Sequence, residues 1–211
     1  MTDTTRQRKF WNRIAARYAA RPLKNVAAYE AMLTDIARRL HPDDRVLELG
    51  CGTGGTAIHL APCVTQWTAC DFSPAMIRIA QAKPAGGNLR FIVADVMQAL
   101  ETGPCDVVCA INVLHLVDDM PAVLAQIHAH LPPGGRLIIK IWCFADLNWR
   151  IRVVFNTLSV FGLFPATKKL RHVDVNDALH LAGFEVVAEK VFGDYPQNLY
   201  FVLRKPAIPA Q

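Results

Sequence analysis

The stretch Arg45-Val-Leu-Glu-Leu-Gly-Cys-Gly-Thr-Gly-Gly55 decides the fold. Its first five residues predict a short buried strand, and a helix is expected directly after the glycines, to about Pro62. Glycines 50, 52 and 54 allow positive φ and let a ligand approach the backbone closely. The free N–H groups of the following helix would face the same loop. The stretch therefore predicts a strand, a loop and a helix that together hold a polar or anionic group.

Strand-like and helix-like segments alternate on the C-terminal side of this loop. Strands are expected at residues 64–70, 89–93, 106–111 and 136–141, and helices are expected from Ser73 onward and over 119–131. Ser73 followed by Pro74 is typical of a helix start. Residues 106–111 form a continuous apolar run, as in a strand that is covered on both faces. The spacing matches βαβ units and predicts an α/β fold with a doubly wound, parallel sheet.

The two ends of the chain follow other patterns. Helices are expected at 5–20 and 26–40, with a break at Arg21-Pro22. A helix at 173–182 precedes two strands, 184–191 and 199–205, whose short connection requires antiparallel pairing. We expect a single domain over 1–211, divided into cap helices (1–40), a core (41–142), an insert or lid (143–172) and the C-terminal helix with its strand pair (173–205).

Composition limits the classes of protein. Of the 211 residues, 52% are hydrophobic and 19% are charged, which excludes a disordered chain. The net charge of +5 is concentrated in the first 24 residues; it fits a solvated helix face or attraction to an anionic substrate or membrane surface, and is too mild to indicate nucleic acid. The six cysteines are interpreted as small buried side chains in a reducing compartment. Without an apolar run of spanning length or a signal segment, a cytoplasmic protein is expected.

Three acidic residues distinguish between possible ligands of the loop. Glu48 lies where it would repel a pyrophosphate and attract an ammonium group. Asp71, at the end of the second strand, can accept both hydroxyls of a ribose, and Asp95 can accept from an adenine amine. Ribose, adenine and a zwitterionic tail describe S-adenosylmethionine (SAM). The loop also fits Gly-x-Gly-x-x-Gly through Gly55, so an NAD(P)-dependent Rossmann oxidoreductase stays open as an alternative.

Five segments together resemble the class I SAM-dependent methyltransferases. They are Val46–Gly54, Cys70–Met76, Ala94–Val96, Cys105–His115 and Leu131–Leu137. The resemblance covers roughly residues 40–142, and it implies a Rossmann-like seven-stranded sheet of order 3-2-1-4-5-7-6 with strand 7 antiparallel. The segment Phe10–Tyr18 is similar to the cap helix of the ubiquinone and menaquinone methyltransferase branch.

The resemblance also implies roles for individual residues. Gly50, Gly52 and Gly54, with Cys51 between them, would flank the methionine moiety, and Tyr18 would approach it from the cap. Asp71 would hold the ribose. The remaining cofactor-binding residues implied are Glu48, Phe72, Met76, Asp95, Val96 and Ile111.

The expected reaction is an in-line SN2 transfer of a methyl group from SAM to a small lipophilic molecule. The acceptor atom (O, N, S or C) is open, and a non-catalytic SAM-fold binding subunit is a further alternative. Such a reaction needs a general base only if the nucleophile must lose a proton. His115 is the candidate base, with local packing as the alternative. Candidate substrate-site residues are Trp11, His115, Trp142 and His172, whereas helix capping is the favoured role of Asp174.

The insert contains an apolar stretch, Ile151–Phe164, with basic residues on both flanks. It could be a lid over a lipophilic pocket, a helix that makes peripheral contact with a membrane, or a contact in a homodimer. Ile111-Asn112-Val113-Leu114 stands where amino-methylating enzymes of nucleic acids have an Asn/Asp-Pro-Pro-aromatic signature, so no nucleic-acid substrate is expected. The sequence offers no metal-ligand set.

Overall fold

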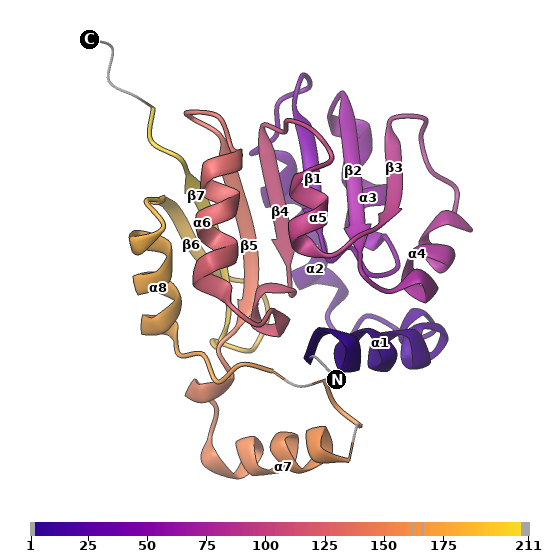
Figure 1. Ribbon diagram of the computed structural model, residues 1–211, viewed down its shortest axis with the longest axis vertical. Helices are drawn as coiled ribbons and strands as arrows, with labels where there is room; N and C mark the ends of the chain where they lie inside the picture. The colour runs from indigo at the N-terminus through magenta and orange to yellow at the C-terminus, as the bar shows by residue number, and fades with distance from the viewer. Residues whose placement is uncertain (1–2, 162, 166, 208–211) are drawn as a thin grey trace.

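A seven-stranded sheet forms the centre of the molecule (Figure 1), in a computed structural model that describes residues 3–161, 163–165 and 167–207. The strand order is β3-β2-β1-β4-β5-β7-β6. The strands are β1 (Arg45–Leu49), β2 (Gln66–Asp71), β3 (Leu89–Val93), β4 (Val107–Ile111), β5 (Arg136–Trp142), β6 (Glu185–Val191) and β7 (Asn198–Arg204). Strand β7 runs antiparallel to both β5 and β6, and the other pairs are parallel. The predicted fold class and strand order are confirmed.

Six helices cover the two faces of this sheet: α2 (Val26–Ala37), α3 (Gly55–Leu60), α4 (Pro74–Gln81), α5 (Val96–Leu100), α6 (Met120–His130) and α8 (His172–Leu181). The other two α-helices of the described chain are α1 (Asp3–Ala19) and α7 (Trp149–Val160). Alternate residues of β1 point to opposite faces. Leu47 and Leu49 lie in the core under α5, α6 and α8, whereas Val46 packs with Trp67 under α2, α3 and α4. The sheet is therefore buried on both sides, as a parallel sheet requires.

Most boundaries agree with the sequence prediction, and two features differ. Helix α5 was not expected, because five residues are too few to show a helical period. Cys63 is exposed, which contradicts the prediction that the cysteines are buried side chains; the other five are buried. Cys63 ends a short 3-10 helix at the surface after α3, where the chain turns toward β2.

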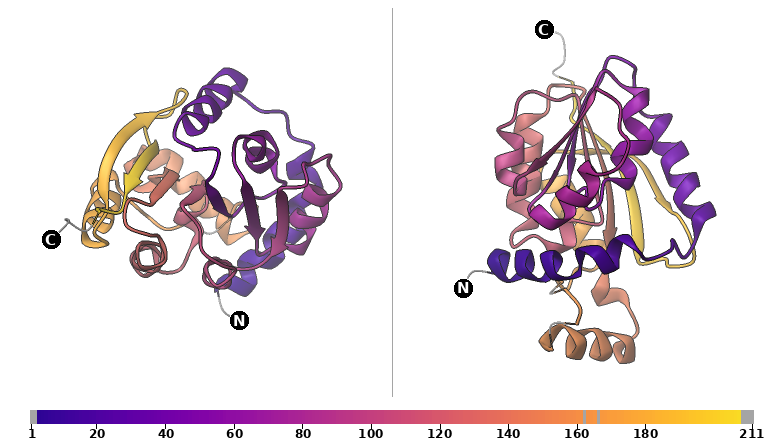
Figure 2. Two further views of the ribbon diagram at one scale, coloured as in Figure 1. Left: turned by 90° about the horizontal axis from the view of Figure 1, so that it is seen from above. Right: turned by 90° about the vertical axis from the view of Figure 1, so that its right-hand side faces the viewer.

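Two helices lie beyond the carboxyl ends of the central strands (Figures 1 and 2). Helix α1 crosses this edge, and α7 projects further from the body. Helix α7 has no buried residue, so its neighbours cover little of its surface. Within the described part of the chain, no helix combines the length and the apolarity of a membrane span.

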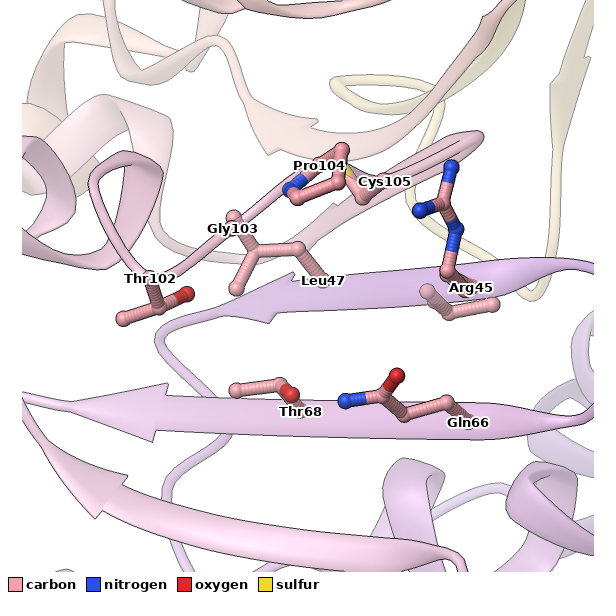
Figure 3. Close-up of a pocket in the computed structure, with 9 residues that line it drawn as sticks. Arg45, Leu47, Gln66, Thr68, Thr102, Gly103, Pro104 and Cys105 are labelled. Carbon is pink, nitrogen blue, oxygen red and sulfur yellow. The ribbon is translucent and has the colours of Figure 1, made fainter.

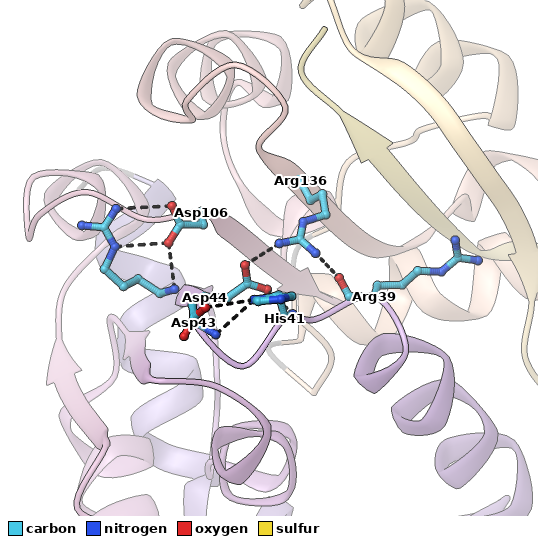
Figure 4. A network of polar contacts seen from close by, with 7 residues as sticks. Arg39, His41, Asp43, Asp44, Asp106 and Arg136 are labelled. Carbon is cyan, nitrogen blue, oxygen red and sulfur yellow. Dashed lines mark hydrogen bonds and ion pairs between the residues drawn. The ribbon is translucent and has the colours of Figure 1, made fainter. Parts of the chain in front are cut away.

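Ion pairs connect the opposite, amino edge of the sheet (Figure 4). Asp106 accepts from the backbone N–H of Arg45 at 2.9 Å and from its guanidinium at 3.2 and 3.3 Å, which joins the starts of β1 and β4. Arg136, at the start of β5, donates to Asp44 and to the carbonyl oxygen of Arg39. These contacts hold together the edge from which the central strands run toward the glycine loop.

Truncation of Ile139 tests the core. Its side chain is fully buried in the middle of β5, so Ile139→Ala leaves a cavity and should lower the free energy of unfolding by about 2–5 kcal/mol. Urea unfolding followed by circular dichroism measures this. Leu181→Ala, at an 88% exposed position on α8, is the control and should change the free energy by about 0.5 kcal/mol or less. Equal effects of the two substitutions would contradict this core.

Candidate active site

The glycine loop after β1 forms the floor of the site. Gly50, Gly52 and Gly54 have φ values of 69°, 55° and 78°, in the left-handed region that favours glycine. A Cβ atom at Gly50 would lie 2.5 Å from Cγ2 of Val113, and one at Gly54 would lie 2.7 Å from Cζ of Phe91. Backbone conformation and close packing therefore both require glycine at positions 50 and 54.

Asp71 holds this loop against the end of β2. Its Oδ2 accepts from the backbone N–H of Gly52 at 3.0 Å, and its Oδ1 accepts from the N–H of Ser73 at 2.8 Å. The side chain is 8% exposed, and burial is the main cause that raises its carboxyl pKa. Each carboxylate oxygen can accept a second hydrogen bond. Asp71 can thus hold the loop and still accept from a ligand hydroxyl.

Helix α1 is anchored next to Asp71. Asn12 Oδ1 accepts from the hydroxyl of Ser73 at 2.7 Å and from the N–H of Ala75 at 3.2 Å, at the start of α4. Sequence reasoning missed Asn12, because a single exposed amide on an amphipathic helix carries no signal of its distant partner. These bonds fix the cap helix beside the glycine loop.

Two aromatic residues of α1 extend the cap toward the loop. The rings of Trp11 and Tyr18 meet edge to face at 5.8 Å, and Cε1 of Tyr18 lies 4.0 Å from the place of a Cβ atom at Gly52. Burial, and then the charge of Asp71, raise the pKa of the Tyr18 hydroxyl. Tyr18 therefore lies over the loop, beside the carboxylate. Contact between Tyr18 and the methionine end of a cofactor stays a prediction.

Glu48 lies under the loop. Its carboxylate accepts from the indole N–H of Trp67 at 3.0 Å in an almost fully buried position, and burial raises its pKa to about 7. It shares the face of β1 with Val46, on the side of α2 and α3. Direct contact between Glu48 and a cofactor stays a prediction.

The other predicted cofactor residues lie at the carboxyl ends of β2, β3 and β4. Asp95 caps α5 by accepting from the N–H of Gln98 at 2.9 Å, and Val96 is the first residue of that helix. Phe72 and Ile111 are half-buried, whereas Met76 is buried in α4. The backbone N–H of Cys51 donates to the carbonyl oxygen of Cys70 at 2.8 Å, which ties the loop to β2.

Asn112, directly after β4, shapes the site through its backbone, and sequence reasoning did not select it. Its φ of 59° is the one positive value at a non-glycine position in the described chain, and asparagine tolerates this conformation better than most residues. Its N–H donates to the carbonyl oxygen of Lys140 at 2.7 Å, and its side chain is exposed. The turn at Asn112 brings Val113 against Gly50. No local pattern in the sequence announces this conformation.

His115 lies in a 3-10 helix after β4 and is 5% exposed. Burial lowers its pKa to about 4, so the imidazole is neutral at physiological pH. Its Nδ1 is buried and has no hydrogen-bond partner among the described residues. The ring centre lies 5.6 Å from that of Phe144. His115 can therefore accept or donate a hydrogen bond as a neutral ring, and it is a weak base.

An aromatic cluster extends from His115 into the insert. We use this name for Trp142, Phe144, Phe155, Phe164 and Tyr195. Phe144 is its centre: it stacks on Trp142 at 5.7 Å and meets Phe155 and Phe164 at 5.9 Å each. Trp142 also contacts Tyr195 at 5.5 Å. The cluster joins the end of β5 to the inner face of α7 and forms an apolar wall.

His172 lies against the outer strands. Its Nε2 is 2.8 Å from Oε1 of Glu189 on β6, and its ring centre is 6.2 Å from that of Phe201 on β7. The substrate role predicted for His172 is untested, but its contacts are not with the aromatic cluster. Asp174 accepts from the backbone N–H of Arg171 at 2.8 Å, which is the capping role expected for it.

A small cavity of about 120 Å³ lies away from these residues (Figure 3). It is lined by residues of β1, of β2 and of the segment before β4: Arg45, Val46, Leu47, Gln66, Thr68, Thr102, Gly103, Pro104 and Cys105. Arg45 and Gln66 begin their strands, so the cavity opens toward the amino edge. It lies toward the opposite end of these strands from the glycine loop.

Comparison with known proteins identifies the family. The family model described as a methyltransferase domain matches residues 11–189. An uncharacterized methyltransferase of Mycobacterium bovis is 34% identical over 104 residues, which cover 49% of this chain and 53% of the relative. A non-reducing polyketide synthase of Aspergillus terreus is 30% identical over 180 residues, covering 74% of this chain and 6% of the synthase. The chain thus spans about half the length of the first relative and a small part of the second.

Solved structures show the same fold. DhpI in complex with S-adenosylhomocysteine (SAH) has a TM-score of 0.74 at 20% identity, covering 98% of this chain and 97% of that chain. Magnesium protoporphyrin IX methyltransferase from Synechocystis PCC 6803 with bound SAM has a TM-score of 0.70 at 16% identity, covering 97% and 98%. With the family match over most of its length, this chain belongs to the methyltransferase domain family.

Substitution of Gly50 tests the loop. Gly50→Ala combines a left-handed backbone with a clash against Val113, and it should lower the free energy of unfolding by at least about 2 kcal/mol. Gly87→Ala is the matched control, because nothing lies within 4 Å of its added Cβ; it should change the free energy by about 0.5 kcal/mol or less. Thermal and urea unfolding measure both. A Gly50→Ala protein as stable as the control would contradict the described loop.

The raised pKa of Glu48 predicts a pH dependence of stability. The unfolded side chain loses its proton near pH 4.5 and the folded one near pH 7, so the folded state holds the extra proton and stability falls as pH rises through this window. Glu48→Gln removes the dependence. Between about pH 4.5 and pH 8, its stability relative to wild type should improve by up to about 3 kcal/mol. Urea unfolding of both proteins at several pH values measures this. If the stability of wild type and of Glu48→Gln changed with pH in the same way, the raised pKa of Glu48 would be contradicted.

Proposed function

We propose that the protein is a SAM-dependent methyltransferase that transfers a methyl group to a small lipophilic molecule by in-line SN2 displacement. The observation that carries this proposal is the hydrogen bond between Asp71 and the glycine loop, which lies beneath helix α1. Asp71 holds the N–H of Gly52 and keeps acceptor capacity for a ribose hydroxyl. The family membership of the chain supports the same activity.

The residues around the glycine loop suit SAM. At Gly52 the nearest atom to an added Cβ is Cε1 of Tyr18 at 4.0 Å, so a ligand can approach the backbone closely there. Asp71 would accept from the ribose, and Asp95 and Val96 would bind the adenine at the end of β3. Tyr18 would cover the methionine end, with Glu48 as a buried acid beneath the loop.

When bound, SAM supplies a methyl group on a positively charged sulfur. The chain has to align the acceptor and exclude water. Helix α1 covers the loop from one side, and the aromatic cluster provides an apolar wall at the end of β5. The neutral imidazole of His115, whose ring centre lies 5.6 Å from that of Phe144, would border the acceptor at this wall. Its pKa of about 4 makes it suited to positioning the acceptor rather than to removing a proton early.

The apolar wall favours a lipophilic acceptor. Trp142 and Phe144 belong to the end of β5 and the turn after it, and Phe155 of α7 meets Phe144. We infer that the insert closes the acceptor side as a lid. Membership of the ubiquinone and menaquinone branch and a cytoplasmic location are parts of the same proposal, and the acceptor atom is left open.

A metabolite extract incubated with methyl-labelled SAM tests the activity. The wild-type protein should produce labelled small molecules. Asp71→Ala should reduce the label about 100-fold or more, because the loop loses its anchor and the ribose its acceptor. Asp71→Asn, which keeps one acceptor oxygen, separates this effect from misfolding and should also lose activity. Asp177→Ala, at an exposed position of α8, is the control and should label like wild type.

Two outcomes of this screen contradict the proposal. A protein that binds SAH but yields no labelled product from any extract would be a non-catalytic binding subunit. Equal labelling by wild type and Asp71→Asn would show that the cofactor is held elsewhere.

Removal of the insert helix tests the lid. Replacement of residues 151–164, of which Gly162 lies outside the described residues, by a short Gly-Ser linker should leave SAH affinity within about twofold of wild type. Turnover should be lost, because the acceptor side is opened to water. Calorimetry with SAH and the labelled-SAM assay measure the two quantities. If SAH affinity fell along with turnover, the proposal that the insert acts only as a lid would be contradicted.

A further inference from the structure

The outer face of α7 is apolar and uncovered. On the inner face, Phe155 belongs to the aromatic cluster, and Leu158 is also partly buried. On the opposite side of the helix and in the turn that follows it, the large apolar side chains are between 53% and 75% exposed: Trp149, Val153, Val160, Phe161 and Leu163. We call these five residues the α7 outer face. Soluble proteins seldom gather so many exposed apolar side chains without a partner.

The surroundings of the α7 outer face are basic. Helix α7 contains Arg150 and Arg152 and no acidic residue. The guanidinium of Arg150 lies 5.6 Å from the ring centre of Trp149. The segment after α7 adds Lys169 and Arg171, and also Lys168, whose ammonium is paired with Asp118 at 3.7 Å.

Helix α1 brings a second group of basic residues to the same edge of the molecule (Figures 1 and 2). The guanidinium of Arg6 donates to the carbonyl oxygen of Ser159 at 3.5 Å, which places the start of α1 next to α7. Further exposed basic side chains follow along α1: Arg8, Lys9, Arg13 and Arg17. An apolar face thus lies beside two sets of cations.

We propose that the α7 outer face docks on an anionic lipid bilayer. An amphipathic helix with tryptophan and aliphatic residues on one side and arginine at its flanks is suited to the lipid interface. Arginine stems can lie along the apolar surface while their guanidinium groups reach lipid phosphates. Each basic residue near the surface adds attraction to anionic lipid.

Charge disfavours a second copy of the chain as the occupant. A twofold contact through the α7 outer face would bring Arg150 and Arg152 close to their own counterparts without an acidic residue on α7 to offset them. An anionic bilayer neutralises the same charges. Docking would also turn the carboxyl edge of the sheet toward the lipid, which suits a lipophilic acceptor. The docking itself does not depend on the proposed reaction.

Co-sedimentation with lipid vesicles tests the apolar part of this surface. The vesicles contain phosphatidylcholine with about one third phosphatidylglycerol, or phosphatidylcholine alone. Wild type should bind the anionic vesicles, and the triple variant Trp149→Ser, Val153→Ser, Val160→Ser should bind at least about tenfold more weakly. Leu181→Ser, at the exposed end of α8 on the opposite edge, is the control for loss of an apolar side chain and should bind like wild type.

Charge is tested with a second matched pair. Arg150→Gln should weaken binding to the anionic vesicles about fivefold, with little effect on vesicles of phosphatidylcholine alone. Arg38→Gln, at the exposed C-terminal end of α2, should have no effect on either.

Three results would overturn the proposal: wild type that ignores anionic vesicles, a triple variant that binds like wild type, or a Leu181→Ser protein that loses binding equally. Light scattering on the same proteins tests whether a second copy of the chain covers the α7 outer face instead. A wild-type dimer that the triple substitution converts to monomer, together with no vesicle binding, would assign the face to a second copy. SAH calorimetry on the triple variant should match wild type, so failure of docking and failure of cofactor binding are distinguishable.

Discussion

The hydrogen bonds of Asp71 are the interaction on which the site depends. One carboxylate oxygen holds the N–H of Gly52, and the other holds the N–H of Ser73. Ser73 in turn donates its hydroxyl to Asn12 of the cap. A single buried carboxylate thus links the glycine loop after β1, the turn after β2 and helix α1. Burial raises its pKa, so these hydrogen bonds are needed to keep the charged form.

Acid groups set the electrostatic character of the site around the glycine loop. Glu48 and Asp71 lie close enough for the charge of Asp71 to add to the raised pKa of Glu48. Desolvated carboxylates near a loop are a poor environment for a pyrophosphate, because like charges repel strongly where water is scarce. They are compatible with a ligand that carries hydroxyls and cationic groups, as the proposed cofactor does. Burial thus raises the pKa of both acids and also disfavours an anionic ligand beside them.

Local patterns in the sequence were sufficient for the sheet and the loop, but long-range contacts were not predictable. The bounds of β3 agree fully with the expected 89–93, and Gly50, Gly52 and Gly54 have positive φ values as predicted. The strand order came from the family resemblance. The role of Asn12, the left-handed turn at Asn112 and the pairing of His172 with Glu189 all depend on partners far away in the chain or on tertiary packing. A single sequence contains no periodic signal for such contacts.

Isothermal titration calorimetry with SAH, and separately with NADH, tests most directly which ligand the glycine loop accepts. We expect saturable binding of SAH to a single site and no binding heat with NADH, because buried carboxylates lie beneath and beside the glycine loop. Binding of NADH by a protein that does not respond to SAH would contradict the proposed cofactor.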